Sequence, residues 1–591
     1  MLQVEKPELS QQADMTWGSD VVAQSLRSLG IEYVSLNPGA SYRGLHDSFV
    51  NYLGNANPSM LLCLHEEHAV AIAHGYAKVT DRPMAVAIHS NVGLMHASMA
   101  IFNAYCDRVP ILMLGANGPM DATARRPWID WLHTTSDQAA PIRGFIKWDD
   151  QPASVSATVT SLARAYALTT ARPSAPTYVC LDWSLQETNE LDSADVAELD
   201  SLPLPVPPAP SAATVEEIVS TIRAASRPVV LFGRATRDEN AWRERIAFAE
   251  AFDVRVLTHQ KLGAVFPTLH PLHVLDPVSH RTPSAQELVR DADLVVSFDW
   301  LDLAGMLKTS GVHDSAHRPQ VISISNDARL HNGWSKDHFD YPFASLTVEC
   351  EPESAVTAIL EHLRVDASAT PLAPATPRRE HVPASTDGDD DPLKLSALAD
   401  AVVERLENES PSYIRLPSSW PATHMEWAHP LDYLGCDGGE GIGSGPGMAI
   451  GGALALRSTD RLPVAIVGDG DFSMGATALW TAAHYELPLL MIVANNGSYL
   501  NDEIHQTHVA SARHRPTQNA WIGQRMTEPA LDMAMLAKAQ GWEGTGPITT
   551  LTQLRTALDK AVETVKAGGR VLLDVRIEVE LERVPRIVEQ K

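Results

Sequence analysis

Short runs of β-branched and other apolar residues recur along the chain, and stretches with apolar positions at helical spacing separate them. The clearest runs lie at residues 85–90, 111–117, 228–233, 293–299, 464–471 and 489–496. Alternation of buried strands with helices is typical of parallel α/β sheets. Each run ends in a small or polar residue, so polar groups are expected at the carboxyl edge, where such sheets bind ligands.

Two proline-rich stretches divide this pattern into three parts. Residues 202–212 are too dense in proline for a helix or an inner strand. Residues 365–392 mix Pro, Ala and Ser with a run of acidic residues. We therefore predict three consecutive parallel-sheet α/β domains, over residues 1–195, 213–364 and 393–591.

Composition narrows the classes of protein that this chain can belong to. Its 591 residues are 45% hydrophobic and 20% charged, an ordinary globular balance. The net charge of −27 repels phosphate backbones and anionic lipids, so we expect no nucleic-acid or membrane partner. The five cysteines form no CxxC pair, and the first residues lack the pattern of a secretory signal. These features predict a cytoplasmic protein in a reducing compartment.

The sharpest chemical signal lies at the ends of two runs in the third part. Gly468, Asp469 and Gly470 end one run, and Asn495 and Asn496 end the next. Glycines let the backbone approach an anion closely, and a following helix can present N–H groups to it. Carboxylate, amide and main-chain carbonyl oxygens are the ligands that Mg²⁺ prefers, with phosphate oxygens completing its shell. The pairing of the two motifs across one strand–helix–strand unit predicts a metal–diphosphate site.

This arrangement resembles the thiamine-diphosphate motif of the decarboxylase and acetohydroxyacid synthase superfamily. Other passages agree with the superfamily in the same order, closest to the benzoylformate decarboxylases, at residues 37–39, 88–93, 147–154, 266–271, 478–488 and 495–499. The resemblance implies a pyrimidine-binding, a central Rossmann-like and a diphosphate-binding domain. It also implies that the chain binds thiamine diphosphate and Mg²⁺.

The resemblance assigns roles in the diphosphate-binding domain. Asp469 and Asn496 are implied as side-chain ligands of the metal, and Ser498 as a ligand through its backbone carbonyl. Gly470 and Asp471 are implied to lie against the diphosphate. Asp471 replaces the small hydroxyl residue of some members, so its carboxylate must point away from the phosphates.

A second set of roles concerns the rest of the cofactor. Residues 64–77 have helical spacing, and the glutamate after a histidine, Glu66, matches the residue that bonds N1′ of the aminopyrimidine. In a glycine-rich run, Ile442 is implied as the apolar support under the bent cofactor, and the Gly441 carbonyl as acceptor for its 4′-amino group. Ser418 and Ser419 either cap a helix or bond the diphosphate.

The substrate end of the site departs from the closest members. His89 matches a histidine that handles protons at the substrate, but Ala40 stands where a serine is expected, with Ser41 next. Residues 297–306, where a second active-site histidine is expected, contain none. After the metal motif, the resemblance implies that an acidic residue, Asp502, protonates the enamine, and His505 on the following turn is a further candidate for proton transfer.

The central domain has no G-x-G-x-x-G motif, so a bound FAD or ADP is not favoured. Arg234 or Arg237 could pair with a nucleotide phosphate, but for each a surface position is the more common use of arginine.

These observations lead to a thiamine-diphosphate-dependent C–C lyase that acts on a small 2-oxo acid or a related carbonyl compound. A decarboxylase of the benzoylformate decarboxylase type is the simplest form. Carboligation, 2-hydroxyacyl-CoA cleavage and acetolactate synthase-like transfer remain alternatives, as does a non-catalytic relative. Because the implied cofactor contacts belong to the first and third domains, the resemblance implies a homodimer or homotetramer whose sites are shared between subunits.

Overall fold

The computed structural model describes residues 5–8, 14–191, 199, 206–312, 318–327, 342–374, 392–436 and 438–581. Within these residues the chain has two compact units. One comprises Met1–Glu380 with Met425–Gly441, and the other His381–His424 with Ile442–Lys591. The acidic run of the second predicted linker lies outside the described residues.

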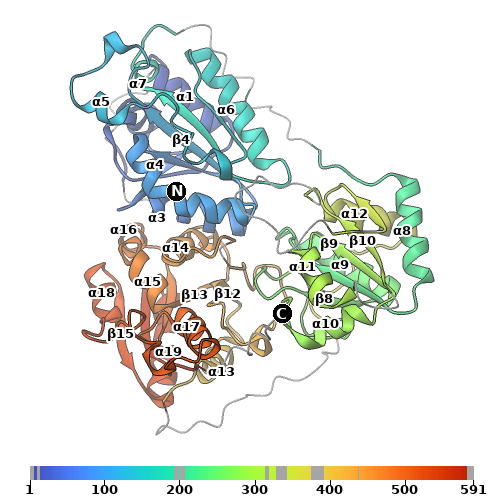
Figure 1. The fold of residues 1–591 in the computed structure, drawn as a ribbon. Helices are drawn as coiled ribbons and strands as arrows, with labels where there is room; N and C mark the ends of the chain where they lie inside the picture. Colours follow the sequence, from blue (N-terminus) through green and yellow to red (C-terminus); the bar gives the residue numbers. More distant parts are fainter. Residues whose placement is uncertain are drawn as a thin grey trace. The chain divides into compact units, whose positions relative to one another are not determined.

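Three parallel sheets run through the described part of the chain, two of them in the first unit and one in the second (Figure 1). Each predicted apolar run contains a strand, so the prediction of three consecutive parallel α/β sheets is confirmed. The inner strands are buried along nearly their whole length because helices cover both faces of such sheets. None of the described helices is long and apolar enough to cross a bilayer.

The first sheet has the strand order β2-β1-β3-β4-β6-β5. Its strands are β1 (Tyr33–Leu36), β2 (Ser59–Leu62), β3 (Met84–Ile88), β4 (Ile111–Asn117), β5 (Trp148–Asp150) and β6 (Thr177–Asp182). The accompanying helices are α1 (Gly18–Ser28), α2 (Arg43–Asp47), α3 (Glu66–Thr80), α4 (Ser90–Cys106), α5 (Ile129–His133), α6 (Val155–Thr170) and α7 (Trp183–Gln186). The chain turns to opposite sides of β1 when it forms β2 and β3. The edge between β1 and β3 is therefore a topological switch point, where open parallel sheets bind ligands.

The second sheet has the order β11-β10-β9-β7-β8. Its strands are β7 (Pro228–Phe232), β8 (Arg255–Thr258), β9 (Leu294–Phe298), β10 (Gln320–Ile324) and β11 (Leu346–Val348). The helices are α8 (Ala212–Ala224), α9 (Glu239–Phe252), α10 (Pro283–Arg290), α11 (Leu303–Thr309) and α12 (Pro352–Leu363). Its own switch point lies between β7 and β9.

The third sheet, in the second unit, has the order β12-β13-β14-β16-β15. Its strands are β12 (Pro411–Arg415), β13 (Leu462–Gly468), β14 (Leu489–Asn495), β15 (Glu543–Ile548) and β16 (Arg570–Arg576). The helices are α13 (Leu395–Leu406), α14 (Gly445–Leu456), α15 (Asp469–Gly475), α16 (Leu479–His484), α17 (Leu500–Ala512), α18 (Met533–Ala539) and α19 (Leu551–Lys566). Because β13 and β14 pair directly, their carboxyl ends bring the two predicted metal motifs side by side.

Candidate active site

Two polar side chains meet at the switch point of the first sheet. His89 directly follows β3, and Ser41 lies in the short 3₁₀ turn Ala40–Tyr42 after β1. The Ser41 hydroxyl is 2.8 Å from Nδ1 of His89. Ala40 stands where a serine is expected, but the next residue, Ser41, supplies a hydroxyl to His89.

Gly39 explains how the turn comes so close to His89. A Cβ atom built on Gly39 would lie 2.4 Å from Cβ and Cγ of His89, far inside contact distance. Only glycine therefore allows this packing. The motif at residues 37–39 thus has a steric role beside the histidine, and spacing alone does not reveal it.

Glu66 opens helix α3 and is buried, at 6% exposure. The ring of His65 caps the helix by accepting a hydrogen bond from the Glu67 amide, so Glu66 lies at the positive end of the helix dipole. Its carboxylate approaches His96 of α4, with 3.1 Å between Oε2 and Nδ1. A Cβ on Gly93 would come within 2.9 Å of Oε1, so that glycine leaves room for the carboxylate. Glu67 is only half-buried.

His89 and Glu66 share an electrostatic environment. Burial lowers the pKa of His89 below the usual histidine value, the nearby His133 lowers it further, and Glu66 opposes both by raising it. His89 is therefore neutral at pH 7 and can act there as a proton acceptor.

In the second unit, the loop after β14 closes on the carboxylate of Asp469. Asp469 accepts hydrogen bonds from the amides of Gly470 at 2.8 Å and Gly497 at 2.5 Å. Burial raises the pKa of this carboxyl, and these N–H groups oppose the rise. Asn495 accepts from the same Gly497 amide and is itself bonded to Asp574. The two predicted motifs are thus joined directly.

Ser498, the predicted carbonyl ligand, is held by residues that sequence reasoning missed. Its hydroxyl donates to Glu503 of α17 at 2.7 Å, and Arg525 binds the same carboxylate with two nitrogens. Burial alone would raise the pKa of Glu503, but the bonds from Arg525 and Ser498 lower it overall. Successive residues of a helix point to different faces. On α17, Asp502 is therefore exposed while Glu503 is buried.

His505 lies on the same helix and is half-buried. The structure does not bring it or Asp502 into a contact with the metal motifs that would identify a proton donor. Their assignment stays a prediction.

The carboxylate of Asp471 turns toward the glycine-rich loop. Its Oδ1 accepts from the amides of Gly443 at 2.7 Å and Gly445 at 3.2 Å, and Oδ2 lies 3.4 Å from Arg415. Asp471 therefore binds the loop before α14, and its place relative to the diphosphate stays a prediction. Its partner Arg415 was not predicted.

Gly441 and Ile442 are neighbours in the glycine-rich run, but their surroundings differ. Asn103 of α4 holds Gly441 from both sides: its Nδ2 donates to the Gly441 carbonyl at 2.9 Å, and its Oδ1 accepts from the Gly441 amide. Ile442 is 37% exposed, which is unusual for isoleucine and suits a residue that supports a ligand.

Ser418 and Ser419 lie exposed in a turn after β12. In the described part of the chain no helix begins at either residue, so the capping interpretation is wrong. Their alternative use, as diphosphate ligands, stays a prediction.

The residues present fit the group that the sequence implies. The Asp469 carboxylate accepts from the Gly497 amide and the Asn496 carboxamide from the Ser498 amide, so both side chains are held at the same loop beside adjacent strand ends, and such hard oxygen donors suit Mg²⁺. A Cβ on Gly468 would meet no atom within 4 Å, so the approach to the motif is open. The buried Glu66 of the first unit likewise offers a carboxylate suited to a ring nitrogen.

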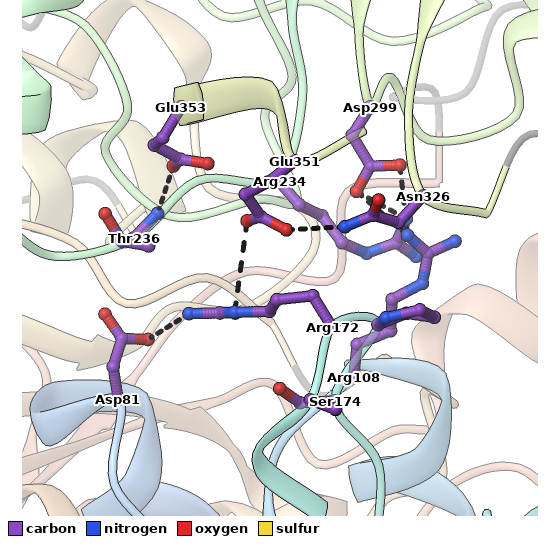
Figure 2. A network of polar contacts seen from close by, with 12 residues as sticks. Asp81, Arg108, Arg172, Ser174, Arg234, Thr236, Asp299, Asn326, Glu351 and Glu353 are labelled. Carbon is purple, nitrogen blue, oxygen red and sulfur yellow. Dashed lines mark hydrogen bonds and ion pairs between the residues drawn. The ribbon is translucent and has the colours of Figure 1, made fainter. Parts of the chain in front are cut away.

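A separate polar network in the first unit lines a cavity of about 100 Å³ at the switch point of the central sheet. Figure 2 shows Arg172 between Asp81 and Glu351, and Arg108 beside Asp299. These arginines come from the first domain, and Asp299 and Glu351 from the central one. The network therefore joins the two domains of this unit by ion pairs.

Arg234 and Arg237 take part in this network and are not on the open surface. The expectation of a surface position for these two arginines is therefore wrong. Arg234 lies 3.9 Å from Asp299, and Arg237 donates to the carbonyls of Ala264 and Leu434. Burial lowers the pKa of both guanidinium groups. Their charges are thus used within the protein.

Comparison with known proteins agrees with this geometry. Residues 16–140 match the N-terminal TPP binding domain of the thiamine pyrophosphate enzymes, 215–329 the central domain, and 417–575 the C-terminal TPP binding domain. Together these segments cover more than half of the chain.

Individual relatives are distant. The chain is 23% identical to benzoylformate decarboxylase of Pseudomonas aeruginosa, over 80% of this chain and 85% of that protein. It is also 23% identical to the acetolactate synthase large subunit of Lactococcus lactis, over 82% and 81%. A solved 4-hydroxybenzoylformate decarboxylase of Rhodococcus jostii shares the fold with a TM-score of 0.76 at 21% identity, over 96% of this chain and 100% of that one.

Proposed function

The chain belongs to the thiamine pyrophosphate enzyme family, and we propose that within this family it is a C–C lyase, most simply a 2-oxo acid decarboxylase of the benzoylformate decarboxylase type. When bound, thiamine diphosphate with Mg²⁺ supplies the electron sink that this chemistry needs. The protein contributes binding, orientation and proton handling.

The metal and diphosphate are assigned to the second unit. Asp469 and Asn496 bind Mg²⁺ through side chains and Ser498 through its carbonyl, while Gly470 and Asp471 lie along the diphosphate. Ser418 and Ser419 are further diphosphate ligands. The Glu503–Arg525 pair fixes the Ser498 end of the loop, so it positions a ligand without touching the cofactor.

The aminopyrimidine end is assigned to Glu66, with Ile442 beneath the cofactor and the Gly441 carbonyl near its amino group. Glu66 holds and moves a proton at the ring nitrogen. A buried carboxylate at a helix N-terminus, flanked by His96, is suited to this exchange.

The observation that carries decarboxylation is the Ser41–His89 pair at the switch point. A neutral histidine, oriented by a hydroxyl 2.8 Å away and on the same domain as Glu66, can handle a proton at the substrate. Asp502 and His505 are proposed to add proton transfer from the second unit.

One alternative has specific support. An acetolactate synthase stands among the relatives at the same identity as the decarboxylase, which favours carboligation as the second candidate. Cleavage of 2-hydroxyacyl-CoA is a related form of it. A non-catalytic relative is a third candidate, opposed by the presence of Glu66, Asp469 and Asn496.

The assembly is part of the proposal. One cofactor must touch Glu66 in the first unit and Asp469 in the second. In the superfamily that the sequence resembles, these come from different subunits. We therefore propose a homodimer or homotetramer with shared sites.

The decisive test is a panel of aromatic and aliphatic 2-oxo acids, each with and without an acceptor aldehyde, in the presence of thiamine diphosphate and Mg²⁺. Release of CO₂ and aldehyde supports the decarboxylase. Ligated hydroxyketone as the main product would support carboligation, and no turnover while cofactor binds would support the non-catalytic relative.

A further inference from the structure

A second histidine lies against His89. His133 ends the short helix α5, and its ring centroid is 4.9 Å from that of His89 with the planes at 89°. The Ser41 hydroxyl occupies Nδ1 of His89, so the His89 ring is fixed relative to the turn after β1. The expected second active-site histidine of the central domain is absent from residues 297–306.

The fold anchors α5 on both sides of His133. Before it, the Leu132 carbonyl accepts from Asn91 of α4 at 3.1 Å. After it, Thr135 exchanges two hydrogen bonds with the side chain of Asn117 at the end of β4, at 2.8 and 3.0 Å. Both anchors are on elements that begin or end at the carboxyl edge of the first sheet. The contact between the histidines therefore follows from the fold and does not depend on a loose loop.

Among the described residues, four groups face His89, each from a different element packed around it. They are Ser41 from the turn after β1, Glu66 from α3, His133 from α5, and the N-terminus of its own helix α4. Two imidazolium charges about 5 Å apart repel, so protonation of one ring disfavours protonation of the other.

We propose that His133 is a positioning residue that acts through His89: its ring packs edge-to-face against that of His89 and opposes protonation of His89 at the substrate end of the site. This inference rests on the proposed decarboxylase. Decarboxylation of a 2-oxo acid anion consumes one proton and gives an aldehyde and CO₂, with no oxidant or reductant. Repulsion from His133 keeps His89 neutral to a lower pH, so that His89 remains available as a proton acceptor in this reaction.

The test compares His133→Phe with the wild-type protein. Phenylalanine keeps a planar ring against His89 but has no nitrogen to protonate. The pKa of His89 is measured by NMR titration of the cofactor-free protein labelled in histidine, with the signal assigned by its loss in His89→Asn. Removing a like charge at this distance should raise the pKa of His89 by about half a unit. His46→Phe, an exposed histidine of α2, is the matched control and should leave it unchanged.

Activity gives the second readout. In the loaded enzyme, the acid limb of kcat/KM for decarboxylation should move upward with the pKa of His89 in His133→Phe. A purely structural role would lower kcat at every pH without moving the limb. An unchanged pKa for His89 overturns the inference. If the wild type decarboxylates no 2-oxo acid, the proposed function fails, and the titration still decides whether His133 opposes protonation of His89.

Discussion

Replacing Asp471 with asparagine removes one negative charge at the loop before α14 while keeping the side chain's shape. The carboxylate accepts from two backbone amides, Gly443 and Gly445, and faces Arg415, whose side chain is 10% exposed. We expect Asp471→Asn to loosen this loop, because an amide offers one oxygen acceptor and places an N–H where the second oxygen was.

The magnitude follows from these contacts. Bonds to a charged acceptor contribute about 1.5–3 kcal/mol each against about 1 kcal/mol for neutral ones, so two amides lose about 2 kcal/mol together. Removing one member of a buried ion pair costs about 3–5 kcal/mol, and the 3.4 Å separation places Arg415 at the low end. Both figures describe the loss of the same carboxylate charge and are not summed, so the free energy of opening the loop should fall by about 3 kcal/mol, which is roughly a 150-fold faster amide exchange.

Hydrogen exchange with mass spectrometry measures the amide exchange rate of the loop on peptides that contain residues 443–447. Asp532→Asn is the control, since Asp532 is an exposed acid of the same unit that caps α18. Combining Arg415→Met with Asp471→Asn should recover part of the loss, because the charge that faced Asp471 is then also removed.

Two results would refute the reasoning. Exchange in Asp471→Asn within twofold of the wild type would mean that the carboxylate does not hold the loop. Tighter cofactor binding in the same variant, with exchange unchanged, would mean that the charge acts on the diphosphate.

Three further predictions concern other residues. Asp469→Ala should lose thiamine diphosphate binding, measured by calorimetry with Mg²⁺, and chelators should have the same effect; retained affinity would contradict the metal assignment. Glu66→Gln should still bind cofactor but exchange its C2 proton about 10²–10⁴-fold more slowly, and mixing this variant with Asp469→Ala should recover partial activity if sites are shared between subunits. Burial lowers the pKa of His259 to about 3, so its unfolded form binds a proton first as pH falls below 6.5. Between pH 6.5 and 4.5 this costs about 2.3 kcal/mol of stability, and calorimetry should find a smaller loss in His259→Gln.

The strands and the metal motif could be predicted because both depend on local patterns. Long apolar runs such as 489–496 identify buried parallel strands, and the polar residues at their ends must gather at one edge. The same logic places Asp469 beside the loop that follows β14, since the two strands are neighbours.

Other parts of the site depend on packing that no short pattern encodes. Ser41 reaches His89 only because Gly39 allows the turn to approach, and His133 arrives on a helix anchored through Asn91. The spacing from the metal motif points to Asp502, whereas the buried neighbour is Glu503, and only the helical phase of α17 distinguishes them.

The two hydrogen bonds between Asn103 and Gly441 reduce the conformational entropy that is lost when a ligand binds. One carboxamide, 338 positions earlier in the chain, fixes both the amide and the carbonyl of this peptide unit. The conformational entropy of ordering it is lost when the first unit folds, so a bound molecule does not have to supply it. Substitutions at Asn103 should therefore weaken binding because this preorganisation is lost, even though Asn103 need not touch the bound molecule.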